Sequence, residues 1–214
     1  MIEDTIDTIK LAASYTIGSY ILPGKPITDI SEKLHSKIQL RITTCDNIIE
    51  GVKKGKYNLG LIESPLFDDA LIYKKWMEDE LVIFSKIKIP KLIDERNIKN
   101  YRLIARSKNS ITRVVISDFL KNIGLSYQSF KSVSEIDNAT ATIQSVKWSK
   151  PNKQNPTVAI VSQLAIEDEL RREELYKSRI KDHPIMRNFY LIYKEATYDD
   201  MDINRIIESL QNYR

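Results

Sequence analysis

The chain has 214 residues, which is enough for one large domain or two smaller lobes with hydrophobic cores. Hydrophobic residues make up 42% and charged residues 29%, as is typical of a globular protein. The net charge of +4 is too small and too scattered to indicate a nucleic-acid surface. The sequence has no apolar run near the roughly 18–20 residues of a membrane span and no secretory signal at its acidic start. We therefore expect a cytoplasmic protein that does not bind membranes.

The sequence offers little for redox, metal or cofactor chemistry. Cys45 is the only cysteine, which excludes an intramolecular disulfide. His35 and His183 lack metal-ligand spacing to Cys or acidic residues. We find no glycine-rich phosphate loop, dinucleotide fingerprint or nucleophile–base pair in the sequence. The expectation is a protein with no metal, no cofactor, no catalytic residues and no enzymatic activity.

In the first part of the chain, strand and helix patterns alternate. The two-residue period of Thr8–Ala13 predicts a strand, and a helical pattern interrupted near its start by prolines follows over Ile17–Ser36. Lys37–Thr43 and Tyr57–Glu63 are predicted strands, with a helix over Asn47–Lys54 between them. We expect Asp46 to cap that helix and Gly55 to end it. This order favours right-handed parallel crossovers.

A second set of elements follows. Two further strands are predicted at Ile72–Trp76 and Glu80–Ser85. The remaining elements are strands at Arg102–Ala105, Tyr127–Val133, Val158–Val161 and Asn188–Tyr193, and helices at Ser110–Ile123, Glu135–Val146, Ser162–Glu174 and Asp202–Tyr213. The segment Lys147–Thr157, with two prolines, is predicted to be an exposed loop. The two halves are therefore expected to be similar α/β lobes.

Hydroxyl side chains stand where the first strand should turn into a helix. Ser14, Tyr15 and Thr16 follow the strand directly. A helix N-terminus presents free N–H groups and the positive end of the helix dipole, which suit a small polar or anionic ligand. The same residues could instead serve only as a helix cap. Both interpretations stay open at this point.

Five segments in register resemble the effector-binding domain of LysR-type transcriptional regulators. They are Ser14–Pro23, Gly55–Glu63, Asp79–Val82, Asn109–Arg113, and Val158–Ser162 with the following Glu169 and Leu170. The resemblance implies a type 2 periplasmic-binding-protein-like fold, in which two Rossmann-like lobes joined by crossover strands close on an effector in a cleft. It implies lobe I at residues 1–85 plus 187–214 and lobe II at 86–186. The family's DNA-binding winged helix-turn-helix is not expected within this sequence.

The resemblance also implies which residues contact the effector. The candidates are Ser14, Tyr15, Thr16, Thr44, Cys45, Glu63, Asn109, Ser110, Thr112 and Asn138. Cys45 could equally be a small buried hydrophobic residue. Glu63 could bind an amine or an arginine, or it could hold the lobes together. A small anionic metabolite is the expected effector.

Partners follow from the same resemblance. Family domains pair through the first helix and a second-lobe helix, so a homodimer is expected through Ile27–Leu34 and Val114–Leu120. DNA would be bound only through a separate N-terminal domain. The alternative is a solute-binding subunit of a transport system on the same fold.

Overall fold

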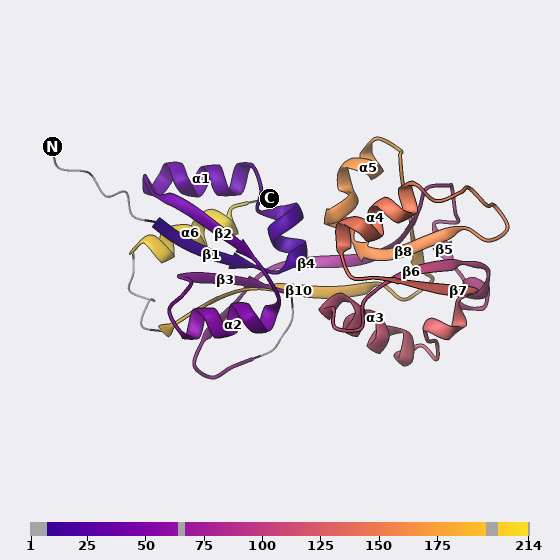
Figure 1. Cartoon of the computed structure of the whole chain (residues 1–214), viewed down its shortest axis with the longest axis horizontal. Helices are drawn as coiled ribbons and strands as arrows, with labels where there is room; N and C mark the ends of the chain where they lie inside the picture. The colour runs from indigo at the N-terminus through magenta and orange to yellow at the C-terminus, as the bar shows by residue number, and fades with distance from the viewer. Residues whose placement is uncertain (1–7, 64–66, 196–200, 214) are drawn as a thin grey trace. The chain divides into compact units, whose positions relative to one another are not determined.

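A computed structural model describes residues 8–63, 67–195 and 201–213. The chain divides into two compact units (Figure 1): unit 1 contains Met1–Glu78 and Asn188–Arg214, and unit 2 contains Asp79–Arg187. The boundary after Glu78 lies inside strand β4 (Ile72–Ser85), where the sequence-based division placed it after Ser85. Strand β10 (Ile185–Tyr193) also contributes residues to both units.

Unit 1 is built on a mostly parallel sheet with the strand order β2-β1-β3-β10. Strands β1 (Thr8–Ala13), β2 (Lys37–Ile42) and β3 (Leu59–Ile62) are parallel, and β10 runs antiparallel to β3. The four residues of β3 are all buried, which agrees with a strand covered on both faces. The first strand is confirmed at the predicted residues.

Helices cover both faces of this sheet. In Figure 1, α1 (Lys25–Leu34) and α6 (Met201–Gln211) lie on one side of it and α2 (Cys45–Lys53) on the other. A short π-helix, η1 (Ile17–Ile21), precedes α1, as the prolines in this stretch require a break. Gly55 follows α2 with φ 69°, so the predicted glycine end of this helix is confirmed.

Within unit 2 the strands follow the order β4-β8-β6-β7. Strands β6 (Arg102–Arg106), β7 (Ser132–Ile136) and β8 (Thr157–Ser162) are parallel, and β4 is antiparallel to β8. Helices α3 (Ile111–Asn122) and α4 (Ala139–Lys147) pack on opposite sides of β6 (Figure 1). The strands β5 (Leu92–Ile93) and β9 (Tyr176–Ile180) extend the sheet beside β4.

Short helices complete unit 2. They are the 3-10 helices η2 (Glu95–Asn100), η3 (Tyr127–Ser129) and η4 (Gln163–Ile166) and the single-turn α5 (Glu167–Arg171). The core gathers apolar side chains of β4, β6 and β8 with those of α3, among them Leu81, Leu103, Ile116 and Ile160.

Five predicted elements between residues 72 and 174 were wrong in type or extent. The two strands Ile72–Trp76 and Glu80–Ser85 are one strand, β4. The predicted strand at Tyr127–Val133 begins as the 3-10 helix η3, and the strand β7 starts at Ser132. The predicted helix from Glu135 starts only at Ala139, because Asn138 caps α4. The predicted helix Ser162–Glu174 is divided between η4 and α5.

Candidate functional site

The carboxyl ends of the three parallel strands of unit 1 meet at one edge of the sheet. The backbone N–H of Ser14 donates to the carbonyl of Leu61 at 2.9 Å, and that of Thr43 donates to the carbonyl of Ala13 at 3.1 Å. These bonds hold the residues after β1 against the end of β3 and the residues after β2 against the end of β1. The structure therefore brings Ser14–Thr16, Thr43–Cys45 and Glu63 to the same edge.

Ser14 carries the most informative side chain at this edge. Ser14 is 3% exposed, and its Oγ has no hydrogen-bond partner among the described residues. A buried hydroxyl without a partner costs about 1–3 kcal/mol. The absence of a side-chain bond also means that Ser14 does not cap the following helical segment through its hydroxyl. Ser14 Oγ is therefore available to a bound polar group.

The neighbouring residues differ in exposure. Tyr15 is 46% exposed, whereas Thr16 is 5% exposed. The backbone N–H of Thr16 donates to Oε1 of Glu63 at 3.0 Å. Glu63 is itself buried, at 5% exposure. Its carboxylate thus takes a position beside a helix N-terminus that a ligand anion could otherwise occupy. This edge already contains one negative charge of the protein.

Thr44 and Cys45 have local structural roles at the start of α2. Thr44 is the N-cap: its side chain accepts a hydrogen bond from the backbone N–H of Asn47 at 3.4 Å. The prediction that Asp46 caps this helix was wrong, because Asp46 already lies in the first helical turn. Its charge there is favourable to the helix dipole. Cys45 is 3% exposed, which agrees with the alternative that it is a small buried hydrophobic residue.

Unit 2 has a corresponding edge at the ends of β6, β7 and β8. Asn109 and Ser110 follow β6, and Ser110 is the N-cap residue of α3 without a side-chain capping bond. Asn138 follows β7, and its Oδ1 accepts from the backbone N–H of Ala141 at 3.1 Å. Asn109 and Asn138 are exposed and Ser110 is half-buried. All three lie at this edge of unit 2.

Thr112 differs from these three because it is buried. It is 5% exposed, and its Oγ1 accepts a hydrogen bond from Nη1 of Arg187 at 3.3 Å. The hydroxyl therefore belongs to an internal network of unit 2 in this structure.

The centre of that network is a buried ion pair. Nε of Arg187 donates to Oδ2 of Asp79 at 2.7 Å, with side-chain exposures of 3% and 0%. The hydroxyl of Ser162 donates to Oδ1 of the same aspartate at 2.7 Å. The network thus connects β4, β8, β10 and the first turn of α3. A charged residue within an apolar strand pattern was the sequence signal for it, since such residues are rarely buried unless they are paired.

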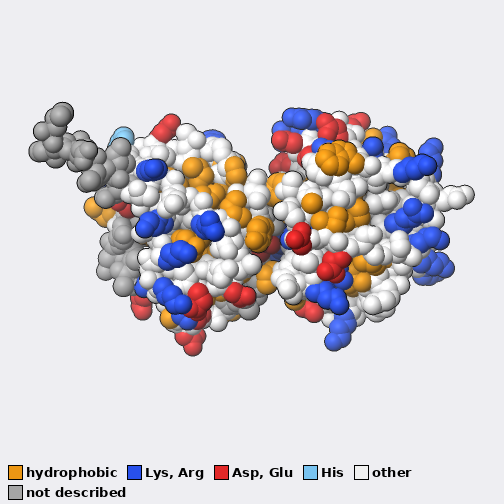
Figure 2. Space-filling model, in the orientation of Figure 1, with side chains coloured by type: hydrophobic (Ala, Val, Ile, Leu, Met, Phe, Trp, Pro, Cys, Tyr) orange, Lys and Arg blue, Asp and Glu red, His pale blue; other side chains and the backbone are white. Residues whose placement is uncertain are grey.

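Neither a metal site nor a membrane segment is found in the part of the chain that the structure describes. Within residues 8–63, 67–195 and 201–213, no three His, Cys, Asp or Glu side chains are grouped as metal ligands. None of the helices in these ranges has the length and apolar composition needed to cross a bilayer. Figure 2 shows Asp and Glu side chains among the Lys and Arg side chains on the visible face of each unit.

The two α/β units and their strand-end edges agree with a family model that matches nearly the whole chain. The family model described as "LysR substrate binding domain" matches residues 3–214, so the chain belongs to this family. The resemblance seen in the sequence is thereby confirmed. Family membership also bears out the expectation of a regulatory ligand-binding domain and not an enzyme, and it does not favour a transport subunit.

Two relatives are transcriptional regulators by name. The chain is 24% identical over 203 residues to "Uncharacterized HTH-type transcriptional regulator YeiE" of Escherichia coli K12, covering 94% of this chain and 66% of that protein. It is 32% identical over 132 residues to "HTH-type transcriptional regulator CysL" of Bacillus subtilis, covering 59% and 44%. The chain thus spans 66% or less of the length of these relatives.

Solved structures show the same fold. The regulatory domain of CcmR from Synechocystis, in complex with 2-PG, matches with a TM-score of 0.78 at 18% identity, covering 96% of each chain. The effector-binding domain of QuiR in complex with shikimate matches with a TM-score of 0.75 at 16% identity, covering 98% of this chain and 97% of that one. The expected fold class, α/β and type 2 periplasmic-binding-protein-like, is confirmed.

Proposed function

We propose that this chain is the effector sensor of a LysR-type transcriptional regulator and that it binds a small organic anion at the carboxyl edge of the unit 1 sheet. The observation that carries the site is Ser14 Oγ, which is buried and has no partner among the described residues. A ligand oxygen that hydrogen-bonds to this hydroxyl would remove the cost of leaving it unsatisfied. The ligands in the CcmR and QuiR structures support a small effector.

Glu63 narrows the chemistry of this effector. Its carboxylate already accepts from Thr16 N–H, so a second anionic group placed there would be repelled. Tyr15 is exposed at the same edge and can add apolar contact. The proposal is therefore an anion that also carries a hydroxyl, with the hydroxyl directed to Glu63 and the charged group nearer the Ser14 hydroxyl. Asn109, Ser110 and Asn138 are proposed as contacts from unit 2.

The regulatory output is proposed by analogy with the relatives. Binding changes regulation only if the effector has different affinities for two arrangements of the protein. The names of the relatives, HTH-type transcriptional regulators, support an output through a helix-turn-helix DNA-binding segment. A cytoplasmic location is part of the same proposal.

A homodimer is proposed through α1 and α3. On α3, Val114 is 47% exposed, and Val115 and Phe119 are only partly buried. These side chains leave apolar surface available for a second copy. Light scattering should give a mass near twice 24.8 kDa for the domain. A monomer at high concentration would contradict this part of the proposal.

The binding site is tested by a thermal-shift screen of small organic anions that includes shikimate and 2-PG. An effector present at 100 times its dissociation constant should add about 2.7 kcal/mol of stability. Ser14→Ala should abolish most of this shift. The matched control is Ser36→Ala, which removes a buried hydroxyl that donates to the carbonyl of Leu34 at 3.0 Å, at the other end of the strands. Equal shifts in wild type and Ser14→Ala would reject the proposed site.

A further inference from the structure

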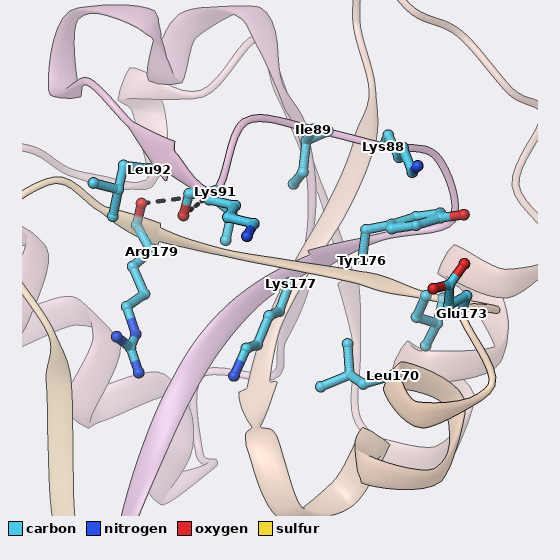
Figure 3. Close-up of a pocket in the computed structure, with 11 residues that line it drawn as sticks. Lys88, Ile89, Lys91, Leu92, Leu170, Glu173, Tyr176, Lys177 and Arg179 are labelled. Atoms are coloured by element: carbon cyan, nitrogen blue, oxygen red, sulfur yellow. Dashed lines mark hydrogen bonds between the residues drawn. The ribbon is translucent and has the colours of Figure 1, made fainter.

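Unit 2 has a pocket apart from its strand-end edge. It has a volume of about 820 Å³ and is formed by the segment before β5, by β9 and by residues around the end of α5 (Figure 3). Pockets for small ligands have volumes of roughly 300–1,000 Å³. The pocket is therefore large enough for a small organic molecule.

Basic side chains predominate in its lining. Lys88, Lys91, Lys177 and Arg179 contribute positive charge, against the single carboxylate of Glu173. Lys177 and Arg179 are two residues apart on β9, and Figure 3 shows both side chains projecting to the same side of this strand. The pocket thus combines a concave surface with an excess of positive charge.

Two of these ammonium groups are not neutralised by the protein. Lys177 Nζ donates to the neutral Oε1 of Gln163 at 2.8 Å, and Lys91 Nζ has no acidic partner among the described residues. Arg179, by contrast, is paired with Glu80. The backbone at Lys91 is fixed, because its carbonyl accepts from Arg179 N–H at 3.1 Å. Lys91 and Lys177 can therefore pair with a ligand anion.

Apolar groups lie beside these charges. Leu92 is 54% exposed at the pocket, and Leu170 and Ile89 are partly buried there. The ring of Tyr176 lies 5.7 Å from Lys88 Nζ, within the range of a cation–π contact. A ligand could therefore pack an apolar body against these apolar side chains and pair a negative charge with the lysines.

We propose that this pocket is a second ligand site, which binds an organic anion with a flat apolar or aromatic body. The anionic group pairs with Lys91 and Lys177, and the apolar body packs against Leu92 and Leu170. The site lies wholly within unit 2 and does not depend on the proposed effector site at Ser14. It would allow a second small molecule to act on the same sensor.

The test uses anilinonaphthalenesulfonate, a fluorescent aromatic anion, and its uncharged relative N-phenylnaphthylamine. Lys91→Gln and Lys177→Gln should each weaken binding of the sulfonate by about twofold to fivefold, and by about tenfold together. The same substitutions should leave binding of the uncharged dye nearly unchanged. Leu92→Ser should weaken binding of both dyes.

The matched control is Lys99→Gln with Lys131→Gln, which removes two exposed lysines of unit 2 that do not line the pocket. Circular dichroism of each variant checks that it is folded. The proposal is overturned if the Lys91→Gln/Lys177→Gln double variant binds the sulfonate as tightly as wild type or as the control. Ser14→Ala should bind it normally, and loss of binding in that variant alone would assign the dye to the other site and also overturn the proposal.

Discussion

Replacing Arg187 by methionine should reduce the free energy of unfolding by about 3–5 kcal/mol, because it leaves the carboxylate of Asp79 buried without its cation. The structure supports a value in this range. The two side chains are 3% and 0% exposed and 2.7 Å apart, so water can replace little of the lost interaction. Ser162 would still donate one hydrogen bond to Asp79, which is far less than the lost charge pairing.

Removing both charges should be less harmful than removing one. In the double variant Asp79→Leu with Arg187→Met, no uncompensated charge remains, and we expect recovery of more than half of the loss in Arg187→Met. The hydroxyls of Ser162 and Thr112 lose their partners, which prevents full recovery. The resulting double-mutant cycle measures the coupling of the pair directly.

Equilibrium unfolding in urea, followed by circular dichroism, measures these free energies. The matched control is Arg171→Met, which removes an arginine whose side chain is 70% exposed and whose ion pairs to Glu167 and Asp168 are 3.7 and 3.5 Å long. That change should cost no more than about 1 kcal/mol. If Arg187→Met is no more destabilising than the control, the buried pair does not stabilise unit 2 as argued.

Three further predictions concern other positions. Gly60→Ala should destabilise by about 1–3 kcal/mol in urea unfolding, because its Cβ would lie 2.5 Å from Cγ2 of Ile48, and an unchanged midpoint would contradict this. The Arg96 side chain, hydrogen-bonded to Asp94, lowers the pKa of that carboxyl to about 2. Its contribution to stability is therefore complete above the usual pKa of 3.8 and lost as the pH falls toward 2. A carbon NMR titration of Arg96→Gln should show the Asp94 pKa raised part of the way toward its usual value, because the backbone N–H of residue 96 still donates to Asp94 Oδ1. No change would refute the assigned cause. Ser14→Ala without ligand should be as stable as wild type or more stable in thermal unfolding, since it removes an unpartnered buried hydroxyl, whereas a loss would indicate a structural role.

Local patterns predicted much of the fold. The alternation in Thr8–Ala13 located β1, and Gly55 marked the end of α2, with φ of 69°. Both depend on the residue and its immediate neighbours, which the sequence contains directly.

Strands with charged residues were harder to predict. β4 was divided in the prediction because Glu78 and Asp79 interrupt its apolar pattern, although Asp79 is accommodated by Arg187 from a strand over a hundred residues away in sequence. β9 was missed because Lys177 and Arg179 alternate with Ser178 and Ile180, and only the packing against β4 and β5 shows that this is a strand. Such partners are set by the tertiary structure and not by local propensity.

In the candidate site, too, some features could be predicted from the sequence and others could not. Parallel strands bring their carboxyl ends to one edge, so the grouping of Ser14, Thr44 and Glu63 could be predicted from element order. The bond from Thr16 N–H to Glu63 and the lack of a partner for Ser14 Oγ depend on side-chain positions. The sequence alone could not indicate them.

The central claim is that an effector binds at the carboxyl edge of unit 1, and amide NMR of the labelled domain tests it most directly. With the anion that gives the largest thermal shift, the amides of Ser14, Tyr15 and Thr16 should show the largest changes in chemical shift, and Ser14→Ala should reduce them. Saturable changes confined to β9 and the segment before β5, with Ser14–Thr16 unaffected, would contradict the claim.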